Sequence, residues 1–133
     1  MRDHMGQFLI SIAASYGGLY SALEVEATAL KKVLSWLKTQ EFTNVIIETD
    51  AQAIVQCLAN MVKDITLVGL LILECHNILS QCPHFTLSFV RRQANVVSHA
   101  LTKLSYMYAT PCIWEEPPVT IVGALSHDIS SMQ

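Results

Sequence analysis

Three side chains with acid, base or ligand chemistry fall at positions that the sequence pattern marks out: Glu26, Asp50 and His99. Glu26 lies along the apolar stripe that Leu23 and Leu30 define, and a carboxylate there must be partnered, protonated or at the rim of a site. An ion pair with a neighbouring lysine at the edge of the stripe explains its position equally well. Glu26 is therefore a candidate site residue for which both interpretations stay open.

Asp50 ends the short apolar run at residues 44–50, at the C-terminal end of a predicted strand. Open α/β sheets place ligand groups beyond the carboxyl ends of their strands. Helix capping is the alternative, since Thr49 and Gln52 have capping-box spacing and an aspartate in the first helical turn suits the helix dipole. The two interpretations are compatible, so Asp50 is the second candidate.

The stretch FVRRQANVVSHALTKL, residues 89–104, leads from a strand end into an amphipathic helix. It gathers polar side chains at one junction: Arg91, Arg92, Asn95 and His99. Asn95 is a good helix N-cap. At about 100° per residue, His99 lies opposite the apolar side of the helix and next to Lys103. His99 is therefore either an idle surface residue, which pattern alone favours, or a site residue.

Composition limits what this chain does. Of its 133 residues, 52% are hydrophobic and only 14% are charged, which suits one folded domain and argues against disorder. The net charge is −3 and the isoelectric point is about 5.9. No long-range positive field is expected from such a chain, so any binding of nucleic acid must rely on local clusters such as Arg91 and Arg92.

The cysteines and the apolar runs indicate an intracellular protein, cytoplasmic or nuclear, with no membrane association. Four cysteines occur without a CxxC pair, as expected of reduced thiols. Cys75, His76, Cys82 and His84 match no common zinc-ligand spacing. The longest apolar run, residues 67–73, is too short to cross a bilayer. The apolar residues 8–15 indicate a strand rather than a secretory signal.

These candidates need strands and helices to position them, and the hydrophobic periodicity predicts a mixed α/β order. A turn covers residues 3–6 and a strand residues 7–16. A helix covers residues 21–40, and a strand that looks buried on both faces covers residues 44–50. A helix follows at once, then a helix at 66–80, a strand at 84–90 and a helix after Asn95. A C-terminal extension, residues 109–133, holds a possible short helix at 118–125 and a loose end.

The order of these elements, together with four motifs, resembles the RNase H type-1 fold, especially the plant RNase H-like domains related to retroelement reverse transcriptases. The motifs are RDHMG, EVEATALKKVL, VIIETDAQAIVQCL and FVRRQANVVSHALTKL. The resemblance covers nearly the whole chain, with residues 1–108 as a partial domain whose mixed sheet is flanked by helices. Any one motif is weak, whereas four in order at suitable spacing are specific.

The resemblance implies an endonuclease that hydrolyses the RNA strand of an RNA–DNA hybrid with two Mg²⁺ ions. By position, Glu26, Asp50 and His99 match catalytic metal ligands of that family, His99 standing where many members have aspartate and many of the plant members have histidine. Arg91, Arg92 and Asn95 match the junction that meets the nucleic-acid backbone.

One departure changes the expected activity. The family takes its first and most central carboxylate from an Asp-Gly pair in the opening strand, and these 133 residues contain no Asp-Gly pair. We therefore expect a chain that lacks the first, central strand and most of the second. Neutral imidazole is also a poor ligand for Mg²⁺. Little or no cleavage of hybrids is predicted.

Three hypotheses follow for the function. The chain is a truncated hybrid ribonuclease, or a non-catalytic module that kept the fold and binds nucleic acid or protein. An unrelated α/β domain would require the four motif matches to be coincidence.

Overall fold

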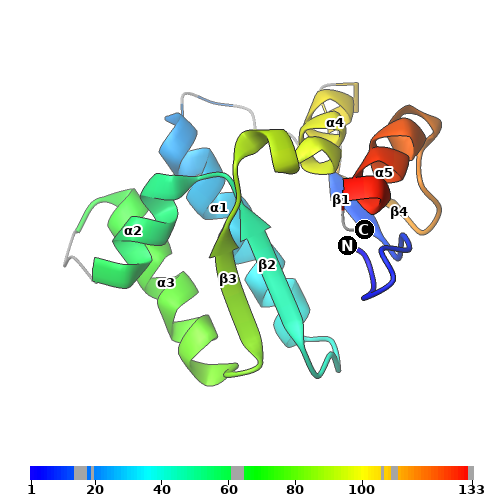
Figure 1. Ribbon diagram of the computed structural model, residues 1–133. Helices are drawn as coiled ribbons and strands as arrows, with labels where there is room; N and C mark the ends of the chain where they lie inside the picture. Colours follow the sequence, from blue (N-terminus) through cyan, green and yellow to red (C-terminus); the bar gives the residue numbers. More distant parts are fainter. Residues whose placement is uncertain (14–17, 19, 61–64, 106, 109–110, 132–133) are drawn as a thin grey trace. The chain divides into compact units, whose positions relative to one another are not determined.

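The computed structural model describes residues 1–13, 18, 20–60, 65–105, 107–108 and 111–131, and it is a mixed α/β protein (Figure 1). Its elements in order are β1 (Ser11–Ala13), α1 (Ala22–Lys38), β2 (Val45–Thr49), α2 (Gln52–Asn60), α3 (Leu67–Gln81), β3 (Phe85–Phe89), the short 3-10 helix η1 (Arg92–Ala94), α4 (Val96–Ser105), β4 (Cys112–Trp114) and α5 (Val119–Ser131). None of the described helices has the length and apolar character that a membrane span requires.

The chain forms two compact units. The α1–β3 unit is Gly18–Val90, and the α4–α5 unit combines Met1–Gly17 with Arg91–Gln133. Among the described residues, each unit contains one two-stranded sheet: β2 with β3 in the first, β1 with β4 in the second. The mixed α/β class predicted from the sequence is confirmed.

Helix α1 begins at a capping box and packs by one apolar stripe. The Ser21 hydroxyl accepts a hydrogen bond from the Glu24 N–H at 3.2 Å, and the Glu24 carboxylate accepts one from the Ser21 N–H at 2.6 Å. These bonds satisfy two amides that the first helical turn leaves open. The buried residues of the stripe are Ala27, Leu30, Leu34 and Leu37. They form the core of this unit with buried residues of α2, α3, β2 and β3.

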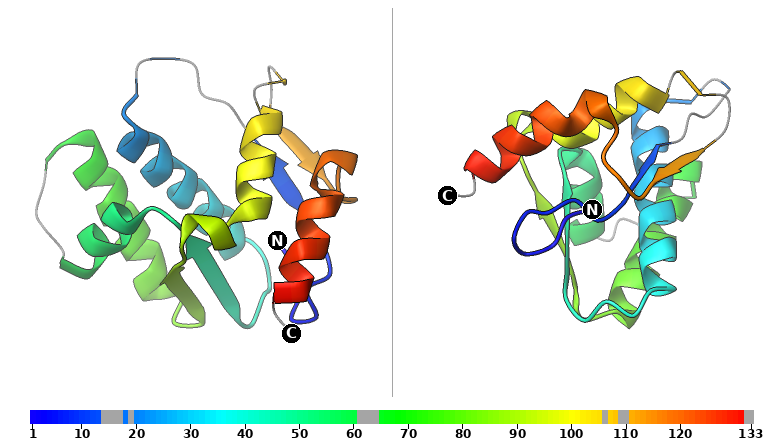
Figure 2. Two further views of the ribbon diagram at one scale, coloured as in Figure 1. Left: turned by 45° about the horizontal axis from the view of Figure 1, so that its top comes forward. Right: turned by 90° about the vertical axis from the view of Figure 1, so that its right-hand side faces the viewer.

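Strands β2 and β3 run parallel, with Val45 opposite Phe85 and Thr49 opposite Phe89. The helices of this unit lie on one side of the two strands (Figure 2, right). Ile47 is buried on that side, but Ile46, which points to the other face, is 70% exposed. The expectation that this strand is buried on both faces is therefore wrong, because helices cover only one face of the pair.

The α4–α5 unit has its own small core. Leu104 of α4 packs with Ile121 and Leu125 of α5, all three buried, and with partly buried neighbours of α4 and the N-terminal segment. Strands β1 and β4 pair antiparallel, with Ser11 opposite Trp114. Residues 111–131, assigned from the sequence to a C-terminal extension, thus contribute β4 and α5 to this unit. The predicted short helix at 118–125 is confirmed and extends further, to residue 131.

The N-terminal segment forms the predicted turn. One carboxylate oxygen of Asp3 accepts hydrogen bonds from the backbone N–H groups of Met5 and Gln7, both at 2.9 Å. Gly6 has φ of 76°, a left-handed conformation that glycine adopts without strain. The described strand β1 is shorter than the predicted strand at 7–16, and residues 14–17 lie outside the described residues.

Candidate functional site

Two of the predicted site residues lie in the α1–β3 unit. Glu26 is on the second turn of α1, and Asp50 follows the last residue of β2. Glu26 is exposed, so its expected place along the buried stripe is wrong. The stripe is centred on Ala27 and Leu34, both fully buried, and Glu26 is rotated by about 100° from Ala27 toward solvent.

Asp50 sits at the turn that joins β2 to α2. Its carbonyl accepts a hydrogen bond from the Gln52 N–H at 3.1 Å, and the Thr49 hydroxyl accepts one from the Ala51 N–H at 3.1 Å. These local bonds fold the chain from strand to helix without a longer loop. Asp50 is partly exposed at the carboxyl end of β2, as predicted for a ligand-side position.

The other predicted residues lie in the α4–α5 unit at the start of α4. Arg91 precedes η1, Arg92 begins it, and Asn95 separates it from α4. The Asn95 carbonyl accepts the hydrogen bond of the His99 N–H at 3.2 Å, which is the first turn of the helix. The predicted helix start after Asn95 is confirmed, and this start fixes the side of α4 on which His99 lies.

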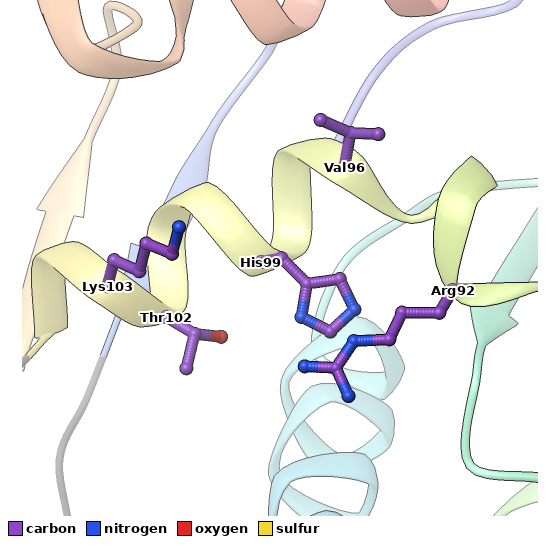
Figure 3. Close-up of a pocket in the computed structure, with 5 residues that line it drawn as sticks. All are labelled: Arg92, Val96, His99, Thr102 and Lys103. Carbon is purple, nitrogen blue, oxygen red and sulfur yellow. The ribbon is translucent and has the colours of Figure 1, made fainter.

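A hollow of about 350 Å³ lies along α4. Its lining consists of Arg92, Val96, His99, Thr102 and Lys103. Figure 3 shows the guanidinium of Arg92 beside the imidazole of His99, with Thr102 and Lys103 on the following turn. The spacing of one helical turn between His99 and Lys103 puts both on the same face.

This face is opposite the packed side of α4. Val97, Ala100 and Leu101 pack against the core of the unit, as the periodicity predicts. The sequence pattern therefore placed His99 correctly, on the side of the helix away from the core. It also named Lys103 as a neighbour of His99, but it did not identify Lys103 or Thr102 as site residues.

The hollow is cationic although the protein is acidic overall. Two basic side chains, Arg92 and Lys103, line it, and no carboxylate is among its lining residues. In the described part of the chain, neither Arg92 nor Lys103 forms an ion pair with a carboxylate. The Thr102 hydroxyl donates to the Ser98 carbonyl at 3.0 Å, so its proton is already engaged. The charged groups of the hollow are thus the guanidinium of Arg92 and the ammonium of Lys103.

A pair of Mg²⁺ ions requires a different set of ligands. Hard divalent cations take carboxylate oxygens, whereas His99 offers a ring nitrogen and has Arg92 and Lys103 beside it in the hollow. Among the residues that the structure describes, no group of three or more His, Cys, Asp or Glu side chains is placed to hold a metal ion. The lining of the hollow on α4 therefore does not fit a two-Mg²⁺ site.

Comparison with known families gives one match. A family model described as reverse transcriptase-like matches residues 1–105, which is more than three quarters of the chain and ends with α4. No curated protein matches the chain significantly.

Proposed function

The chain belongs to the reverse transcriptase-like family of RNase H-like domains, and from this membership we propose that it binds nucleic acid without cleaving it. The family makes it a nucleic-acid-related domain. The proposal has two specific parts. The protein contacts the sugar-phosphate backbone, and it prefers an RNA–DNA hybrid to other nucleic acids.

The composition of the candidate site is the observation that carries this proposal. Cleavage with two metal ions uses carboxylates to hold both ions around one phosphodiester. The chain offers two candidate carboxylates, Glu26 and Asp50, and its sequence contains no Asp-Gly pair. His99, the third predicted ligand, lines a hollow together with Arg92 and Lys103. Cationic side chains favour a phosphate and disfavour a divalent cation.

Overall charge makes the proposed binding modest. With a net charge of −3, the protein as a whole repels a polyanion, so attraction depends on the local cations of α4 and η1. We expect weak binding at low ionic strength that falls steeply as salt is added.

Fluorescence anisotropy tests this proposal. Labelled single-stranded RNA, single-stranded DNA, duplex DNA and RNA–DNA hybrid of matched length are titrated with the whole protein at low salt. We expect a rise in anisotropy that salt reverses, with the hybrid bound at least as tightly as duplex DNA. Absence of binding to all four forms would overturn the proposal.

A further inference from the structure

We propose that the edge of β2 that faces away from β3 pairs with the same edge of a second copy of this chain, antiparallel and centred on Ile46, to form a weak symmetric dimer. This interaction goes beyond nucleic-acid binding and uses none of the residues that line the hollow on α4. The partner is a protein strand, and main-chain hydrogen bonds along the sheet edge recognise it.

The sheet of the α1–β3 unit has few strands for its type. Strands β2 and β3 lie side by side and run parallel, and among the described residues no further strand joins them (Figure 1). Parallel sheets normally have helices on both faces, and a sheet of only two strands is marginal. Here the helices of the unit cover one face. An added strand at an edge therefore stabilises this sheet.

The printed hydrogen bonds show which backbone groups the β2 edge offers. The Val45 N–H donates to the His84 carbonyl at 3.0 Å, and the Thr49 carbonyl accepts from the Val90 N–H at 2.9 Å. Both bonds are on the β3 side of β2. Because backbone groups alternate in direction along a strand, the N–H and C=O of Ile46 point to the other edge.

Composition distinguishes β2 from β3 as the edge that pairs. Ile46 and its register partner Thr86 lie on the same face of the sheet, away from the helices. On this face β3 carries the polar Thr86 and Ser88, as is typical at a sheet edge, whereas Ile46 of β2 is apolar and 70% exposed. Natural edge strands often carry lysine or proline, which prevent pairing, and β2 contains neither.

Charge selects one register for two antiparallel copies of β2. A two-fold axis at Ile46 sets the two Ile46 side chains opposite each other and Glu48 opposite the neutral Asn44. An axis at Glu48 would set two carboxylates opposite each other, and like charges in that position destabilise a strand pair. An axis at Ile47 would set Ile46 opposite Glu48. The axis at Ile46 is therefore favoured, and it also brings Val45 opposite Ile47 on the helix-covered face.

The symmetry of this contact limits the assembly to two copies. The same edge is used on both, so the interface is isologous and closes as a dimer. The product is a four-stranded sheet in the order β3, β2, β2, β3. One pair of short strands buries much less than the roughly 1,600 Å² of a standard interface, so we expect a weak dimer.

Sedimentation velocity of the whole protein, from low micromolar to millimolar concentration, tests the contact. We expect wild type to shift from monomer toward dimer as concentration rises. Ile46→Lys sets two ammonium groups opposite each other across the axis and should weaken dimerisation about tenfold or more. Ile46→Val keeps an apolar, β-branched side chain and should dimerise nearly as wild type does.

Thr86→Lys is the matched control for the added charge. Thr86 is exposed on the same face as Ile46 but lies one strand further from the axis. Three strand spacings, about 14 Å, would separate the two copies of this lysine, which is beyond the screening length at physiological salt. This variant should therefore dimerise nearly as wild type does. Circular dichroism checks that every variant is folded.

Amide hydrogen exchange at two protein concentrations gives a second readout. In a weak dimer the Ile46 amide exchanges through the monomer fraction, so its protection should rise several-fold with concentration and stay below that of Ile47. The protection of Ile47, which lies in the ladder with β3, should not change.

Each outcome decides the proposal. A concentration-dependent dimer that Ile46→Lys weakens and Thr86→Lys does not, with matching protection of the Ile46 amide, supports it. A monomer at every concentration overturns it, as does a dimer that Ile46→Lys leaves unchanged or that both lysine variants weaken equally. Strong protection of Ile46 at every concentration would place another strand on this edge and also overturn it. None of these results bears on nucleic-acid binding.

Discussion

Cys75 is the most deeply buried of the four cysteines, with no exposed surface, on the face of α3 that packs into the core. Burial, with a smaller contribution from the Glu74 carboxylate, raises the pKa of the Cys75 thiol to about 11. A thiol with this pKa stays protonated at neutral pH, and only the thiolate is a good nucleophile or metal ligand. Cys75 is thus a packing residue.

Alkylation of the native protein checks this role. Treatment with iodoacetamide at neutral pH should modify the partly exposed Cys57 and Cys112 well before Cys75, as followed by mass spectrometry of peptides. Unfolding in urea should remove the difference. Modification of Cys75 in the native protein as fast as Cys112 would contradict its placement in the core.

At the scale of single residues, hydrophobic periodicity predicted on which side of a helix a residue lies, but not which groups surround it. It placed His99 on the side of α4 away from the core of the α4–α5 unit, and the structure confirms that side. Its prediction that Glu26 lies along a buried stripe is wrong, because Leu23 marks only the partly buried margin of the α1 stripe. The cationic surroundings of His99 depend on Arg92, which reaches the hollow from a separate element, and a helical pattern carries no information about such a contact.

Among the elements, α1 depends on its N-terminal cap. Replacing Ser21 with alanine removes the hydroxyl that accepts from the Glu24 N–H, and this should lower the free energy of unfolding by about 1 kcal/mol. Urea denaturation followed by circular dichroism measures the change.

Ser35→Ala is the matched control for this prediction, since Ser35 is exposed within the same helix. Alanine has the higher helix propensity, so the control should be neutral or slightly stabilising. An equal loss of stability in both variants would show that the hydroxyl of Ser21 has no special role.

Element boundaries set by local sequence were predictable, whereas the burial of an element, which depends on the elements packed against it, was less so. The immediate passage from β2 to α2 and the start of α4 after Asn95 follow from local sequence. The continuous apolar run in β2 predicted burial on both faces. The structure buries only one, because burial depends on which other elements pack there and the run itself cannot specify them.

Among the described residues of the α1–β3 unit, the β2 edge of the parallel sheet is open. Among the described residues β2 pairs only with β3, and the Val45 N–H donates to the His84 carbonyl. Backbone N–H groups alternate in direction along a strand. The N–H of Ile47 therefore points to β3, like that of Val45, while the N–H of Ile46 points to the open edge. The Ile46 side chain is exposed as well, which leaves this part of β2 accessible to water.

Amide hydrogen exchange measured by NMR tests the open edge. The Ile46 amide should exchange much faster than its neighbour Ile47, whose N–H lies in the ladder with β3. Equal, strong protection of both amides would mean that another strand pairs with this edge in solution.

For the molecule as a whole, the family was predictable from the sequence, and the function of the site stays a prediction. Four motifs in order led to the RNase H-like family, and the family match over residues 1–105 confirms it. Sequence alone assigned His99 to a metal by analogy of position. In the structure His99 lines a hollow with Arg92 and Lys103, and these neighbours are part of the basis for the proposal of binding without cleavage.

The central claim, binding without cleavage, has one direct test. An RNA–DNA hybrid labelled on its RNA strand is incubated with excess whole protein and Mg²⁺, at a concentration where anisotropy shows the hybrid to be bound, and the strand is then analysed by gel. We predict intact RNA with wild type and with Asp50→Asn alike. Mg²⁺-dependent cutting by wild type that Asp50→Asn abolishes would contradict the claim and identify the protein as a hybrid ribonuclease.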